Sequence, residues 1–123
     1  MTTTNLAELE ARARRKIAAH WQRCEKANLG RTSENCDQVL SAFDTYFRQM
    51  EKLIGVKDKV ALREPLRSIY ARLGEINAAN GDVLLETDER ELLVPFIVDA
   101  VAVAGFDLNE FPDREPGGEF RDF

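Results

Sequence analysis

Residues on which most catalytic and metal sites depend are scarce in this chain. Its 123 residues include one histidine, His20, and two cysteines, Cys24 and Cys36. Two cysteines cannot build a disulfide framework. The sequence has no short repeated Cys/His spacing typical of zinc sites, no Glu-x-x-His motif and no EF-hand loop. We therefore predict no metal, no cofactor and no catalytic residues.

His20 is the single candidate for a histidine general base. It lies beside Trp21 near an apolar stripe, where a lone histidine is more often a packed or surface residue than a catalytic one. Nothing near the two cysteines suggests an activating base, and both lie on apolar stripes that favour core packing. An enzymatic function would require His20 to be buried among carboxylates, beside a metal or an open cavity.

Long apolar runs and a secretory leader are also missing. The longest apolar stretch, residues 92–106, contains Pro95 and Asp99 and is shorter than the ~20 residues that span a bilayer. Residues 1–16 have no apolar core before their charges, so we expect no secretory signal and a cytoplasmic protein with reduced thiols. A net charge of −5 without aromatic-basic interleaving argues against nucleic acid, and the interrupted basic face of the first helix argues against a membrane partner.

Apolar residues recur at steps of three and four in four segments, and no segment shows convincing strand-like alternation. This pattern predicts an all-α, four-helix bundle-like single domain over residues 1–123. Residues 1–4 read as a frayed end. The stripe of the first helix runs from Leu6 to Cys24, and that of the second runs from Cys36 to Ile54. Both cysteines and Ile54 are therefore predicted core residues.

Capping residues and prolines predict where the helices begin and bend. The predicted starts lie at Asn5, Thr32 or Ser33, Lys57 or Asp58, and Thr87. Pro65 and Pro95 fall inside the third and fourth helices. Each removes a backbone donor, so we expect kinked helices, although Pro65 can instead start the main part of its helix. Residues 106–123, with two prolines and paired glycines, predict a partly irregular tail with one helical turn over 107–111. Its phenylalanines pack it on the bundle, or the tail extends from it.

Charge is distributed unevenly along the chain. Residues 1–73 hold 14 Lys/Arg against 9 Asp/Glu, whereas residues 74–123 hold 3 against 13. Such asymmetry can mark an interaction surface. It is equally typical of two halves that attract each other across the fold, or of two solvated faces. The stretch "LLETDEREL", Leu84 to Leu92, concentrates four carboxylates around Arg90, which we expect to pair with one of them. Acids in the first turn of a helix are also favoured by the helix dipole.

The run "LGEINAANGDVLLETDERELLVPFIVDAVAVAGFDLNEF", Leu73–Phe111, resembles a pattern in small α-helical bacterial immunity proteins of polymorphic or contact-dependent toxin systems. The pattern is a helix ending in Leu-x-x-Ile/Leu-Asn, an acidic loop, "ETDERE", and an apolar helix ending at glycine. That group ends in an aromatic-Arg-acid-aromatic motif, which corresponds here to residues 120–123, "FRDF", with phenylalanine in place of tryptophan. The resemblance implies a non-enzymatic protein that binds and neutralises a cognate toxin, without naming the toxin.

An acidic surface suits a basic toxin, because complementary charge speeds encounter and suppresses wrong partners. The candidate partner-binding residues are Glu86, Asp88, Glu89, Glu91, Asp107, Glu110 and Asp113. Phe106 and Phe111 are either apolar anchors among these acids or core residues. The alternative function is a structural or regulatory helical adaptor that self-associates or binds another protein. The sequence leaves open whether the chain is a monomer or a homodimer.

Overall fold

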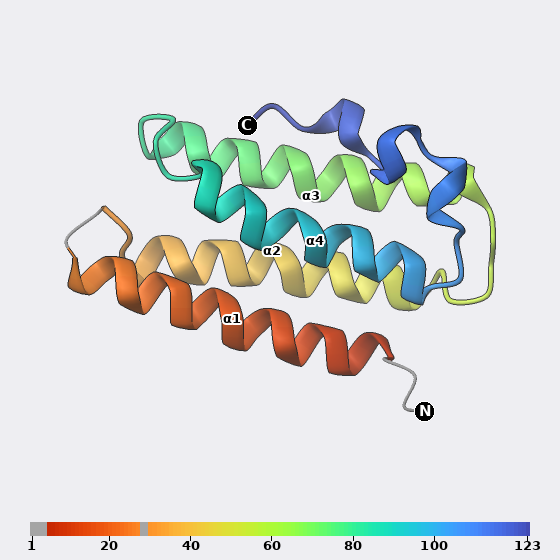
Figure 1. Ribbon diagram of the computed structural model, residues 1–123, viewed down its shortest axis with the longest axis horizontal. Helices are drawn as coiled ribbons and strands as arrows, with labels where there is room; N and C mark the ends of the chain where they lie inside the picture. Colours follow the sequence, from red (N-terminus) through yellow and green to blue (C-terminus); the bar gives the residue numbers. More distant parts are fainter. Residues whose placement is uncertain (1–4, 28–29) are drawn as a thin grey trace.

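The computed structural model, which describes residues 5–27 and 30–123, confirms the all-α fold. Its four long helices are α1 (Leu6–Lys26), α2 (Ser33–Glu51), α3 (Lys59–Ala79) and α4 (Thr87–Val103). Successive helices run in opposite directions, and α1 packs against both α2 and α4 while α2 packs against α3 (Figure 1). No β-strand occurs in the described ranges. The predicted fraying of residues 1–4 lies outside them.

Side-chain caps begin three helices where the sequence predicts them, at Asn5, Thr32 and Asp58. The start of α4 differs from the prediction. Glu86 occupies the cap position, and Thr87 is the first helical residue and exposed. The prediction that Thr87 caps α4 is therefore wrong. The backbone N–H of Glu86 donates to Oε1 of Glu89 at 3.1 Å, so a side chain inside the first turn reaches back to the cap.

The core forms where the apolar stripes of the four helices meet. Its largest fully buried side chains include Trp21, Tyr46 and Tyr70, which come from α1, α2 and α3. Cys36 is buried and Cys24 partly buried. The prediction of Ile54 as a core residue is wrong, because α2 ends at Glu51 and leaves Ile54 in the following turn with 54% of its surface exposed. None of the described helices is long and apolar enough to cross a membrane.

Both internal prolines are accommodated within continuous helices. Pro65 is buried inside α3, and Pro95 is exposed inside α4. Each proline lacks the N–H that would bond the carbonyl four residues earlier, which weakens the helix locally. The kinks that the sequence predicts at these positions stay predictions.

The tail after α4 folds back along α3 (Figure 1). It contains three short 3-10 helices, η1 (Leu108–Glu110), η2 (Pro112–Arg114) and η3 (Gly118–Phe120), so the predicted turn within 107–111 is confirmed. Phe106 is buried, and three further phenylalanines pack against the core, at positions 111, 120 and 123. Gly117 has φ +78°, and a Cβ atom there would lie 2.9 Å from Cβ of Leu66. Only glycine fits this close approach without strain.

Candidate functional site

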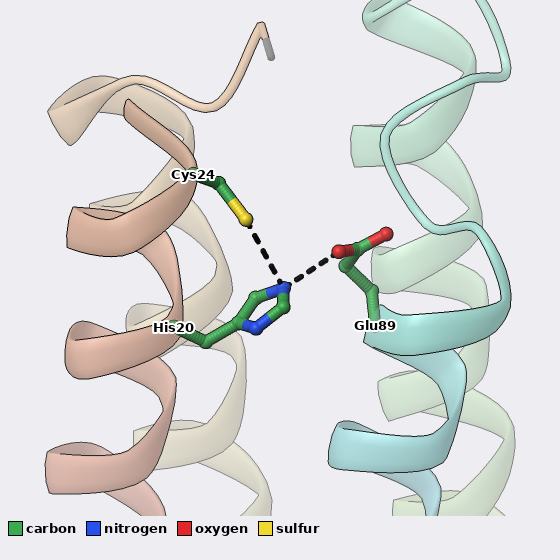
Figure 2. Close-up of side chains that lie close together, drawn as sticks. All are labelled: His20, Cys24 and Glu89. Carbon is green, nitrogen blue, oxygen red and sulfur yellow. Dashed lines mark hydrogen bonds and ion pairs between the residues drawn. The ribbon is translucent and has the colours of Figure 1, made fainter. Parts of the chain in front are cut away.

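A cluster of polar side chains lies at the end of the bundle where α4 begins. His20 and Cys24 extend from one face of α1, because residues four apart lie above one another on a helix. Glu89 extends toward them from the first turn of α4, as Figure 2 shows. The antiparallel packing of α1 and α4 brings the last turns of one helix to the first turn of the other. The fold therefore joins residues 69 positions apart in the sequence.

Glu89 is the centre of this cluster. Its side chain is 4% exposed, with Oε2 2.6 Å from Nε2 of His20 and Oε1 accepting from Nη2 of Arg31 at 2.6 Å. Burial alone raises the pKa of this carboxyl. The hydrogen bonds from His20 and from the Glu86 backbone N–H, together with the Arg31 charge, outweigh burial and hold the pKa below its ordinary value of 4.5. A buried carboxylate is tolerated here because its partners compensate for lost water.

Arg31 and a buried asparagine hold the connection between α3 and α4 against this cluster. The Arg31 guanidinium, which is 9% exposed, also donates to the carbonyl oxygen of Leu84 at 2.7 Å. Oδ1 of Asn77 accepts from the backbone N–H groups of Leu84 and Leu85 at 3.0 and 2.8 Å. Because these backbone groups are satisfied by buried side chains, the loop that leads into α4 is fixed by the interior of the protein.

The geometry at His20 differs from that of a catalytic triad. Sγ of Cys24 lies 3.5 Å from Nε2 of His20, the same ring nitrogen that contacts Glu89 (Figure 2). In a triad, the nucleophile and the carboxylate use opposite nitrogens of the imidazole, so that a proton can pass along the line. Here the thiol and the carboxylate converge on one nitrogen. The three side chains place their ligand atoms within 4.8 Å of one another.

An open cavity of about 200 Å³ lies beside the cluster. Its lining residues are Cys24, Arg31, Glu86, Thr87, Asp88 and Glu89. The cavity thus has a thiol, an arginine and carboxylates around it, and it gives the cluster access to solvent.

The structure separates the predicted acids at the start of α4 by their exposure. Glu86, Asp88 and Glu91 are exposed, and none of them forms an ion pair within residues 5–27 and 30–123. Glu89 is 3% exposed, so its predicted place on a partner-binding surface is corrected: its carboxylate faces the interior. The arginine that pairs with this group of acids is Arg31, whereas the sequence suggested Arg90.

The three predicted acids at the other end of α4 have mostly local roles. Asp107 accepts a hydrogen bond from the Asn109 N–H at 3.0 Å and caps η1. Glu110 lies 3.4 Å from Nζ of Lys59. Asp113 is exposed, with a positive φ of 55°. The 17 residues of α4 separate this group from the first by about 25 Å, so the seven acids form two groups.

Sequence reasoning missed His20, Cys24 and Arg31 as neighbours of Glu89. The spacing His20-x-x-x-Cys24 is a visible signal, since it places both side chains on one helix face. Glu89 lies on α4 and Arg31 lies before α2, and no local sequence pattern links either residue to His20 and Cys24. The chain matches no protein-family model, no curated protein and no solved structure.

Proposed function

We propose that this protein is a non-catalytic immunity protein that binds and neutralises a cognate bacterial toxin in the cytoplasm. One observation carries the proposal: three exposed carboxylates at the start of α4, those of Glu86, Asp88 and Glu91, have no ion-pair partner within the described part of the chain. We call these three residues the acidic patch. The resemblance of residues 73–111 to immunity proteins supports the same function.

The surroundings of the acidic patch suit protein recognition. Side chains buried beneath it fix the start of α4, and a rigid surface loses less conformational entropy when it binds. Val83, just before the patch, is 58% exposed and provides an apolar contact beside the charges. Unpaired surface acids attract a basic partner over a distance of about one Debye length, ~8 Å at physiological salt.

The polar cluster does not have the geometry of a cysteine–histidine–carboxylate triad. Because Cys24 and Glu89 both approach Nε2 of His20, the cluster has no relay from thiol through imidazole to carboxylate. Neutralisation by occupying the toxin's surface requires no such relay.

Co-expression with the toxin tests this proposal. The toxin gene is expected immediately upstream of the gene for this protein, and co-expression of the two should protect cells. Reversing two patch charges, Glu86→Lys with Glu91→Lys, should abolish or strongly reduce protection, because a basic toxin surface would then meet like charge. A toxin that kills cells equally with and without the wild-type protein would refute the proposal.

A matched control separates the acidic patch from net charge. Glu8 and Glu51 are exposed and lie toward the opposite end of the bundle, at the start of α1 and the end of α2. Glu8→Lys with Glu51→Lys changes the net charge by the same amount as the patch reversal. This control variant should protect cells as well as the wild type. Equal loss of protection in both double variants would argue against a localised binding surface.

One observation favours the adaptor function as a second candidate. The connection between α2 and α3 exposes 54% of Ile54 and 49% of Val56, and the first turn of α3 exposes 76% of Val60. Apolar side chains exposed close together can mark a contact with another protein. Sedimentation at low and high salt tests self-association. A dimer held by these residues persists at high salt, whereas a monomer under all conditions excludes it.

A further inference from the structure

We propose that His20, Cys24 and Glu89 form a binding site for a divalent transition metal, with zinc(II) as the best match. The ligand atoms are Nε2 of His20, Sγ of Cys24 and Oε2 of Glu89. This site uses the partly buried side chains of His20 and Cys24 and the buried side chain of Glu89, between α1 and α4, whereas the proposed toxin-binding function uses other residues, those of the exposed acidic patch. The two proposals can therefore fail independently.

The three ligand atoms lie within 4.8 Å of one another, and two of the distances between them can be compared with those of a tetrahedral zinc site. With Zn–N and Zn–O near 2.1 Å and Zn–S near 2.3 Å, tetrahedral angles place N and S roughly 3.6 Å apart and N and O roughly 3.4 Å apart. The Nε2–Sγ distance is already 3.5 Å. The Nε2–Oε2 distance is 2.6 Å, so the carboxylate must move back by somewhat less than about 1 Å. Figure 2 shows the thiol of Cys24 and the carboxylate of Glu89 approaching the same ring nitrogen of His20, so an ion bound by all three groups would take the place of these two contacts.

The ligand types also favour zinc. Imidazole, thiolate and carboxylate together suit zinc(II), which binds nitrogen, sulfur and oxygen ligands without a preference for one geometry arising from its d electrons. One thiolate and one carboxylate would neutralise the charge of the dication. Calcium and magnesium prefer oxygen ligands alone and fit this set poorly.

Arg31 and the neighbouring cavity provide two further features of a metal site, a hydrogen bond that orients a ligand and access for water. Arg31 binds Oε1 of Glu89, which leaves Oε2 directed toward His20. Ligating carboxylates are commonly held by such a second hydrogen bond, which fixes their orientation. The cavity of about 200 Å³ beside Cys24 and Glu89 has room for water molecules, one of which would be the fourth ligand. It also provides an entry path, whose wall carries the carboxylates of Glu86 and Asp88 and the guanidinium of Arg31.

Metal binding replaces protons in the cluster. At 2.6 Å, His20 Nε2 and Glu89 Oε2 share a hydrogen-bonded proton. Binding requires the lone pair of Nε2, so that proton moves to Nδ1 when the imidazole is neutral, or to solvent when it is protonated. The S–H bond of Cys24 breaks as the Zn–S bond forms, which releases one proton to solvent and changes no oxidation state. Metal affinity should therefore rise with pH.

Cobalt(II), a spectroscopic substitute for zinc, tests the site in the purified full-length chain without an affinity tag. Titration of the metal-free protein should produce a thiolate-to-cobalt charge-transfer band and the visible d–d bands of tetrahedral cobalt. Both should saturate at one equivalent, and zinc should displace them. Cys24→Ser should lose the charge-transfer band and bind at least about tenfold more weakly. Cys36→Ser, which alters the only other thiol, should retain the band and the affinity.

A second measurement on the wild-type protein avoids dependence on variants. His20 is the only histidine in the sequence, so its imidazole gives a single set of ¹⁵N resonances. Zinc should shift the Nε2 resonance at one equivalent, and Nδ1 should carry the proton in the zinc-bound form. The absence of a charge-transfer band at saturating cobalt would overturn the proposal. So would retention of the band in folded Cys24→Ser, or zinc binding that leaves the His20 resonances unchanged.

Discussion

The two ends of α4 carry acids of the same type but use them differently. At its start, Glu89 is buried between His20 and Arg31, and the exposed acids around it have no ion-pair partner in the described residues. Beyond its end, Asp107 caps η1 and Glu110 pairs with Lys59 on the surface. Counting charges along the sequence treats the two groups alike. Burial and ion-pair partners distinguish the start of α4, with its buried carboxylate and exposed acidic patch, from the acids beyond its end, which bind nearby groups of the same chain.

Removing the buried carboxylate of Glu89 should lower the unfolding free energy more than any other change considered below. Glu89→Ala removes the carboxylate that pairs with the buried guanidinium of Arg31, and breaking a buried ion pair costs about 3–5 kcal/mol. Glu110→Ala is the matched change at the other end, where the pair with Lys59 is half-exposed and contributes about 0–1 kcal/mol. Urea unfolding of both variants measures the difference. Similar losses of unfolding free energy in the two variants would contradict the distinction between the ends.

Low pH should reduce the stability of the folded protein because Glu89 becomes protonated. The pKa of Glu89 is lower in the folded protein than its ordinary value of 4.5, so the folded state favours the ionised form. Its contribution to stability is complete above about pH 4.5 and is lost as the pH falls through the lower folded pKa. Glu89→Gln lacks this titration. Its unfolding free energy should therefore fall less steeply below pH 4.5 than that of the wild type, as denaturant titrations at several pH values would show. Parallel pH dependence would contradict this assignment.

Thr87→Ala should change the unfolding free energy least. Because Glu86 occupies the cap position and Thr87 is exposed, the substitution should change the unfolding free energy by less than about 0.5 kcal/mol. Asn5→Ala is the comparison at a true cap, where the side chain accepts from the Glu8 N–H at 2.8 Å, and it should cost about 1 kcal/mol. Thermal melts of both variants check the order, and a larger loss in Thr87→Ala would restore the capping role that the sequence suggested.

Local patterns predicted most of the fold. Helical spacing identified the buried stripe from Leu6 to Trp21, and side-chain chemistry located the caps at Asn5, Thr32 and Asp58. These features depend on residues within one or two turns of each other, so a single sequence contains them. The prediction for Ile54 failed because α2 ends at Glu51, so that the helical spacing used to place Ile54 in the core does not continue to that residue.

The polar cluster could not be predicted in the same way. An acid in the first turn of a helix is usually exposed and favoured by the helix dipole, and Glu89 fits that pattern in the sequence. Its burial follows from His20 and Arg31, which are 69 and 58 positions away and approach it only when the bundle forms. Long-range pairing of this kind leaves no periodic signal. Glu86 and Glu91 are exposed, and the prediction that they bind a partner stays a prediction.

Toxin affinity in two charge-reversed variants tests the central claim most directly. One variant is Glu86→Lys with Glu91→Lys at the start of α4, and the other is Glu110→Lys with Asp113→Lys beyond its end. Calorimetric titration against the cognate toxin at low and high salt should show at least about tenfold weaker binding for the first variant. Its loss should be greatest at low salt, and the second variant should bind like the wild type. Equal affinities for the two variants would contradict the account.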